Sequence, residues 1–241
     1  MDAGYTEWAP PPALRGAVCC LWASITPDGG HHESLVLPDA CSDLIWEQNS
    51  GVLVAGPDTA AVPHRTPPVT VLLGVRFWPW AGGPVLGLPL SELRDQRVDL
   101  ASIRPADAKR IPGTLTPELA LASLTDLAGR LVADSETDDV IVGTTRLLRD
   151  PRLRVERVAE EAGISMRQLR RRCDAAVGYG PKTLQRVLKF QRFVRRVDAG
   201  HTDFASLAAD TGYADQAHLT RECAQLAGVT PAVLARLRTA G

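Results

Sequence analysis

Two segments of the chain, residues 155–177 and residues 204–227, repeat one pattern of apolar, glycine and helix-capping positions. In the first segment, "VERVAEEA" predicts a short amphipathic helix, and Gly163 ends it because glycine accepts a left-handed conformation. Ser165 then offers an N-cap, and Gln168 completes the pattern of a capping box. The segment is therefore predicted to form a helix, a tight turn and a second helix.

The second segment has the same layout. "FASLAADT" predicts the first helix, Gly212 the turn, and Asp215 the N-cap of a helix with the sequence "QAHLTRECAQLA". Ser165 and Asp215 are 50 residues apart, so two copies of one motif follow each other. Between them, residues 181–198 predict one helix, about 27 Å long at 1.5 Å per residue. A rod of that length would separate two DNA-reading helices by something near one turn of B-DNA, about 34 Å.

The second helix of each copy has an apolar side and a polar side. In the first copy, helical spacing places Leu169 and Cys173 on one side of the helix, and in the second copy it does the same for Leu219 and Cys223. We expect all four side chains to be buried. The opposite sides are left for solvent or a partner. Their residues are Arg167, Arg170, Arg171, Gln216, His218, Thr220 and Arg221.

The charge of the chain is divided between its two parts. Residues 1–144 hold 9 Lys and Arg against 18 Asp and Glu, whereas residues 145–241 hold 18 against 10. The net charge of −1 therefore conceals a basic C-terminal part, whose cations are nearly all arginine. Arginine makes paired hydrogen bonds to phosphate and guanine, so this composition predicts a polyanionic partner. An arginine-rich helix face alone is usually solvated surface, but the repeat, the turn chemistry and the charge together indicate DNA.

Residues 150–238 resemble the DNA-binding domain of the AraC/XylS family of bacterial transcriptional regulators. The motifs that carry the resemblance are "RVAEEAGISMRQLRRRCDAAVGYGPKTLQRVLKFQRFV" and "SLAADTGYADQAHLTRECAQLAGVTPAVLARLR". The resemblance implies that the second helix of each unit reads bases. The residues that it implies are Arg167, Arg170, Arg171, Gln216, Ala217, His218 and Arg221, to which we add Lys182. The sequence departs from the family pattern at Cys173 and Cys223, where Phe is common, and at Leu234, where Tyr is common.

The acidic part of the chain is rich in predicted strands. Five short apolar runs lie between Pro, Gly, Asn and Asp residues, namely "VCCLWASI", "ESLVLP", "DLIWEQ", "GVLVAGP" and "VTVLLGVRFW". Such a series is typical of a small barrel or sandwich. The resemblance implies a cupin-like sensor barrel, so the expected fold class is α+β, with a β-rich barrel plus helices followed by an all-α domain. The expected domains are 1–115 for effector sensing, 116–149 as helical linker or dimerisation helices, and 150–241 for DNA binding.

Four residues of the acidic part are candidates for an effector pocket, namely Trp22, Trp46, Arg76 and Trp78. Aromatic walls with one convergent cation suit a small molecule. Alternatively, the tryptophans fill the core and Arg76 pairs with an acidic neighbour, and both interpretations stay open. Residues 117–133 predict an amphipathic helix whose apolar stripe would either form a dimer or pack on its own barrel.

Other chemistry has weaker support. His31 and His32 are adjacent, so on a strand they point to opposite faces and do not easily serve one metal ion. No Ser/His/Asp arrangement or phosphate loop is visible, so we expect no enzyme, metal or cofactor. The five cysteines form no C-x-x-C pair, which suits a reduced cytoplasm. No apolar run approaches the roughly 18 residues that a membrane span needs.

These observations predict a cytoplasmic transcriptional regulator that binds double-stranded DNA and responds to a small-molecule effector. RNA polymerase and a second copy of the chain are further candidate partners. Two alternatives stay open, each fused to the same DNA-binding module: a DNA-repair alkyltransferase with a Cys acceptor, and a protein that recruits a partner through its N-terminal half.

Overall fold

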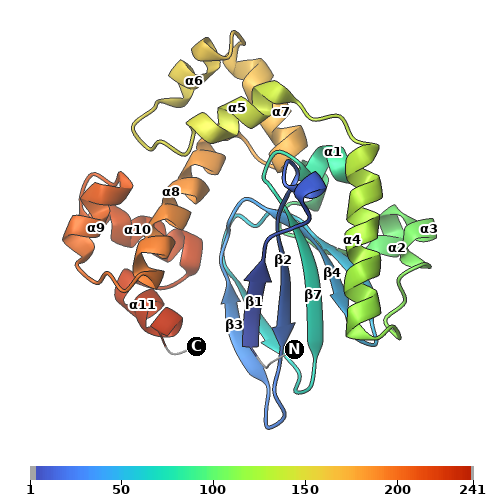
Figure 1. Cartoon of the computed structure of the whole chain (residues 1–241). Helices are drawn as coiled ribbons and strands as arrows, with labels where there is room; N and C mark the ends of the chain where they lie inside the picture. Colours follow the sequence, from blue (N-terminus) through green and yellow to red (C-terminus); the bar gives the residue numbers. More distant parts are fainter. Residues whose placement is uncertain (1–3, 240–241) are drawn as a thin grey trace.

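The computed structural model describes residues 4–239 and places a β-rich N-terminal half before an all-α C-terminal half (Figure 1). The predicted α+β class is confirmed. A six-stranded antiparallel sheet has the order β1-β2-β7-β4-β5-β8, and a two-stranded ribbon pairs β3 with β6. The strands are β1 (Gly4–Trp8), β2 (Val18–Ile25), β3 (His32–Val36), β4 (Ser42–Glu47), β5 (Gly51–Ala55), β6 (Val62–Thr66), β7 (Val71–Phe77) and β8 (Arg97–Asp99).

All five predicted strands are present, as β2, β3, β4, β5 and β7. The other three, β1, β6 and β8, were not predicted because none of them contains an apolar run. In both β1 and β6, four of the five residues are exposed. Pairing with a neighbouring strand defines these three elements, and that pairing has no signature within the segments themselves.

The helix α4 (Pro117–Ala133) lies along the sheet and packs against β7 and β4 (Figure 1). Thr116 caps its N-terminus, and Leu124, Leu127 and Leu131 are buried along one stripe. The apolar stripe predicted at residues 117–133 is thus covered by the protein's own sheet. Of the two outcomes that the sequence left open for this stripe, the structure shows packing within the chain.

Short helical segments connect the sheet to α4. They are the 3-10 helices η1 (Pro12–Leu14) and η2 (Leu90–Leu93), and α1 (Gly82–Leu86), α2 (Leu100–Ile103) and α3 (Pro105–Ala108). The C-terminal half contains α5 (Asp139–Leu147), α6 (Val155–Glu161), α7 (Met166–Val177), α8 (Pro181–Asp198), α9 (Phe204–Thr211), α10 (Gln216–Ala227) and α11 (Pro231–Thr239). None of the helices in the described part of the chain combines the length and the apolar character that crossing a membrane requires.

The two halves pack against each other. The helix α7 contacts both α1 and η2, and the Arg94 Nε donates a hydrogen bond of 2.7 Å to the carbonyl of Gly178, directly after α7. Farther along, Gln191 of α8 donates to the carbonyl of Pro38 at 2.8 Å. The backbone N–H of Ala61 donates to the carbonyl of Leu226, at the end of α10, at 2.7 Å. The N-terminal half therefore touches both repeated units and the helix between them.

Candidate nucleic-acid interface

The first repeated unit consists of α6, a turn at Gly163, and α7. Ser165 caps α7, and its backbone N–H donates to Gln168 at 2.9 Å, which confirms the predicted capping box. Leu169 and Cys173 have no exposed surface, so they anchor α7 to the unit. The predicted DNA-contact residues of this helix, Arg167, Arg170 and Arg171, are all exposed.

The second unit consists of α9, a turn at Gly212, and α10. The Asp215 carboxylate accepts the backbone N–H of His218 at 2.6 Å and caps α10 as predicted. Leu219 and Cys223 are fully buried, so this helix has the same anchored side as α7. The outward residues Gln216, Ala217, Thr220 and Arg221 line one shallow hollow on the helix surface.

His218 lies apart from that hollow and is half-buried. Its ring meets the edge of the Tyr213 ring, with centroids 5.3 Å apart and an interplanar angle of 84°. The backbone N–H of Ala214 donates to its Nδ1 at 3.4 Å. These contacts tie the ring to the turn of the unit, and contact between His218 and DNA stays a prediction.

Lys182 stands at the second position of α8, next to Pro181. Its ammonium nitrogen lies 3.4 Å from a carboxylate oxygen of Glu156, on α6, and both side chains are exposed. Solvent screens an exposed ion pair of this kind, so a phosphate could replace the carboxylate at little cost. The exposed position of Lys182 is compatible with a DNA contact, and that contact stays a prediction.

The four candidates for an effector pocket are distributed over separate places. Trp46 is opposite Leu73 and Trp22 is opposite Gly74 in the paired strands, so the two indoles lie on opposite faces of the sheet. Trp46 has no exposed surface, and its indole N–H donates to the carbonyl of Pro112 at 3.1 Å. Trp22 and Trp46 therefore do not share one cavity, and Trp46 has the environment that the core interpretation predicts.

Trp22 and Arg76 do come together, through Asp43. The Trp22 indole N–H donates to Asp43 at 2.7 Å, and the Arg76 Nε donates to the same carboxylate at 3.1 Å. Asp39 and Glu7 also lie within 3.5 Å of the Arg76 guanidinium. Burial raises the pKa of Asp43, although the charge of Arg76 acts in the opposite direction. Arg76 thus has the acidic neighbours that the alternative interpretation predicted, and its part in ligand binding stays a prediction.

Trp78 belongs to a contact between the two halves of the chain. It stacks on Trp80 with ring centroids 5.3 Å apart. The Arg149 guanidinium lies 5.3 Å from the Trp78 ring, and the Arg146 guanidinium lies 5.7 Å from the Trp80 ring. Cation–π contacts of this kind contribute about 0.5–2 kcal/mol each. Trp78 therefore helps to hold the loop that leads into the first unit.

Comparison with known protein families gives two matches. Residues 158–236 match a helix-turn-helix domain, and residues 6–99 match a domain of unknown function (DUF6597). The C-terminal part of the chain therefore contains a helix-turn-helix domain, and the match falls within residues 150–238, the segment that carries the predicted resemblance. Comparison with curated proteins gave no match.

Among solved structures, the chain is similar to ToxT from Vibrio cholerae. One ToxT structure has 10% sequence identity and a TM-score of 0.47, over 87% of this chain and 99% of that chain. A structure of unsaturated fatty acid bound wild-type ToxT from strain SCE256 has 12% identity and a TM-score of 0.46, over 99% of this chain and 95% of that chain. Because both TM-scores are below 0.5, the class of the protein rests on the helix-turn-helix match.

Proposed function

We propose that the protein is a DNA-binding transcriptional regulator in which α7 and α10 enter two successive major grooves. One observation carries the proposal: two capped helix-turn-helix units stand at the two ends of a single helix, α8, and each presents an exposed polar side on its second helix. Helices of this kind place their first turns against base edges, which is where Arg167 and Gln216 stand.

The exposed side chains also suit the two tasks of such an interface. Arg170 and Arg171 can neutralise phosphates or bind guanine, whereas Gln216 can pair with the N6 and N7 of adenine. In the described structure, Arg167, Arg171 and Arg221 have no carboxylate within ion-pair distance, so they are available to a partner. Arg170 has a weak partner, with its Nε 3.7 Å from Asp174.

The proposal is tested by selecting bound duplexes from a random-sequence library with the full chain. We expect an enriched motif with two half-sites about 10–10.5 base pairs apart, because the two recognition helices are held at a set spacing. Affinity should also fall steeply with salt, since phosphate neutralisation releases counterions. Enrichment of no motif, with equal affinity for all duplexes, would contradict a sequence-specific regulator.

The sheet-rich half is proposed as the regulatory part, in keeping with the regulators that the DNA-binding domain resembles. Its contacts with α7, α8 and the end of α10 give it a physical route to both units. A thermal-shift screen of small metabolites against the full chain tests this role, because a ligand that binds only the folded protein raises its unfolding temperature. A cytoplasmic location, and contact with RNA polymerase, belong to the same proposal.

The alkyltransferase alternative needs a cysteine with a lowered pKa. A hydrogen bond to Cys20 lowers the pKa of Cys19, but a hydrogen bond to Cys41 and burial outweigh it and raise that pKa to about 12. Burial likewise raises the pKa of Cys173 and Cys223 to about 12. Thiols of this kind are poor nucleophiles at neutral pH, so no observation in the described structure favours this alternative.

A further inference from the structure

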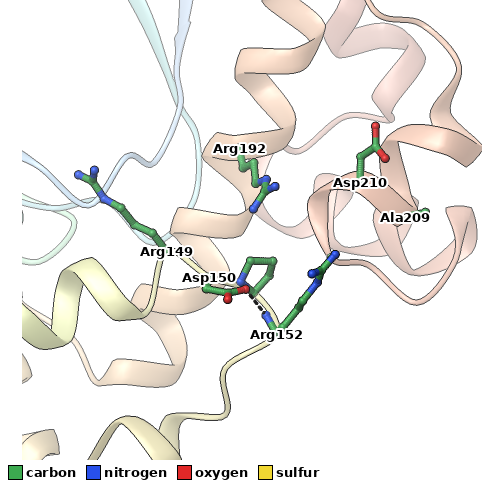
Figure 2. Close-up of a pocket in the computed structure, with 8 residues that line it drawn as sticks. Arg149, Asp150, Arg152, Arg192, Ala209 and Asp210 are labelled. Atoms are coloured by element: carbon green, nitrogen blue, oxygen red, sulfur yellow. Dashed lines mark hydrogen bonds between the residues drawn. The ribbon is translucent and has the colours of Figure 1, made fainter. Parts of the chain in front are cut away.

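A hollow of about 390 Å³ lies in the C-terminal half, between the loop before α6, the helix α8 and the end of α9. It shares no lining residue with the hollow on α10. It is lined by residues 149–152 of the loop between α5 and α6, by Arg192 of α8, and by Ala209, Asp210 and Gly212 around the end of α9. We call it the arginine basin. Figure 2 shows the Arg192 side chain reaching down from α8 and the Arg152 side chain rising from the loop toward the same space.

The lining of the arginine basin holds three arginines, Arg149, Arg152 and Arg192, against two carboxylates, Asp150 and Asp210, so one positive charge is in excess. Asp150 accepts the backbone N–H of Arg152 at 2.9 Å, and Asp210 lies 3.5 Å from the guanidinium of Arg196, outside the basin. Within residues 4–238, no carboxylate lies within ion-pair distance of the Arg152 or Arg192 guanidinium. Two guanidiniums that face one space, neither of them in an ion pair, favour the binding of an anion.

The positive charges of Arg149 and Arg192 also act on the neighbouring Arg195, which does not line the hollow. Burial lowers the pKa of Arg195, and the positive charges of Arg149 and Arg192 lower it further. Arg149 is itself held in place by its contact with the Trp78 ring. An anion bound beside Arg192 would oppose this effect on Arg195, in agreement with the geometry of the hollow.

We propose that the arginine basin binds an oxyanion between the guanidiniums of Arg152 and Arg192. Planar guanidiniums bind phosphate and carboxylate oxygens in pairs. A hollow of about 390 Å³ has the size of a site for a metabolite and is larger than a bare phosphate. The group is a phosphate or a carboxylate, and it comes either from a small molecule or from the DNA backbone.

An anion bound in the arginine basin would connect the two helix-turn-helix units, α6–α7 and α9–α10, which we call the reading units. An added Cβ at Gly212 would lie 2.5 Å from the Cβ of Pro151, so the loop before the first unit already touches the turn of the second. An anion held by Arg152 of that loop and by Arg192 of α8 would add a charged contact across the same junction. The inference goes beyond DNA binding, because it assigns a second ligand site to the DNA-binding half.

The first test uses inorganic phosphate and the full chain, without DNA. At a concentration about fivefold above its dissociation constant, phosphate should raise the unfolding midpoint by about 2–4 °C relative to chloride at equal ionic strength. The double variant Arg152→Gln/Arg192→Gln should lose this shift. The control Arg65→Gln/Arg110→Gln removes two exposed guanidiniums from the N-terminal half and should keep it.

The comparison between variants is needed because phosphate also stabilises proteins through exclusion from their surfaces. That general effect is the same in all variants, whereas binding in the arginine basin depends on Arg152 and Arg192. An equal phosphate shift in the wild type and in Arg152→Gln/Arg192→Gln would rule out an oxyanion from solution in the basin.

The second test identifies the source of the oxyanion. The affinity of the full chain for a duplex of arbitrary sequence is measured over a range of salt concentrations. If the DNA backbone occupies the arginine basin, Arg152→Gln/Arg192→Gln should lower the salt dependence by about two charges relative to wild type. An unchanged slope together with a lost phosphate shift assigns the site to a small molecule, and an unchanged slope with an unchanged shift overturns the proposal. The first test contains no DNA, so its result does not depend on the proposed DNA binding. The oxyanion site can be contradicted while DNA binding holds, and DNA binding can be contradicted while the oxyanion site holds.

Discussion

At the scale of single residues, position on the helix separates the roles of side chains that share one surface. Gln216 and Arg221 both line the hollow on α10, yet five positions put them about 140° apart around the helix. Gln216 stands in the first turn, near the capped end, whereas Arg221 stands more than one turn farther along. We therefore expect Gln216 to contact a base and Arg221 to reach guanine or a flanking phosphate.

Gln216→Ala should relax base preference at one or two positions of the bound site and cost about 1–3 kcal/mol on the preferred sequence. Competition between the selected duplex and single-base variants of it measures this effect. Ala224→Ser, at an exposed position of α10 that is not among the predicted DNA contacts, serves as the control. Equal weakening on every sequence would show that Gln216 positions the helix and does not read bases.

Trp46→Ala should lower the free energy of unfolding by about 3–5 kcal/mol, because the fully buried indole leaves a cavity and the carbonyl of Pro112 loses its donor. Urea denaturation of the full chain measures the change. Trp46→Phe keeps most of the buried volume and should cost less. A folded Trp46→Ala protein of unchanged stability would contradict the core position.

At the scale of elements, glycine at the turns has two separable functions. Gly212 and Gly228 end α9 and α10, and both have positive φ, of 91° and 70°. Any other residue would be strained there. Only Gly212 has a close neighbour, since a Cβ added to it would lie 2.5 Å from Pro151, whereas a Cβ at Gly228 would meet nothing within 4 Å.

Gly212→Ala should therefore destabilise the protein more than Gly228→Ala. The second change costs the backbone strain alone, about 1–2 kcal/mol, and the first adds a clash that displaces the loop before α6. Thermal unfolding of both variants measures the difference. Equal midpoints would mean that the contact between Pro151 and the turn of the second unit contributes no stability.

At the scale of the whole molecule, the contacts between the halves predict that they unfold together. The buried residues of both halves form one continuous hydrophobic cluster, and Arg94, Gln191 and Ala61 make polar contacts between the halves. A set of contacts that touches both reading units and α8 can also transmit a change in the sheet to the spacing of those units. If an effector controls DNA binding, as proposed, we expect it to act through this interface.

This prediction can be checked because the five tryptophans all lie in residues 8–80. Their fluorescence reports the N-terminal half, whereas far-ultraviolet circular dichroism reports mainly the helices of the C-terminal half. We expect coincident unfolding midpoints from the two signals in urea. Arg94→Ala/Gln191→Ala removes two of the contacts and should separate the midpoints, whereas separate midpoints in the wild type would mean that the halves are independent.

The sequence by itself determined the elements whose signals are local. Helical spacing, the caps at Ser165 and Asp215, and the glycines at the turns defined both reading units, and the exposed faces of α7 and α10 lie where these patterns predicted. Apolar runs likewise identified five of the eight strands in the described structure, namely β2, β3, β4, β5 and β7. These signals suffice because a helix, a cap or a buried strand depends on residues within a few positions of each other.

Tertiary structure alone decided the features that join distant segments. Strand pairing placed Trp22 and Trp46 on opposite faces of the sheet and surrounded Arg76 with Asp43, Asp39 and Glu7. Packing joined the two halves and brought Arg152 and Arg192, 40 residues apart in the sequence, to one hollow. Such contacts have no local signature, because the free energy that selects them comes from burying surfaces that meet only when the whole chain is folded.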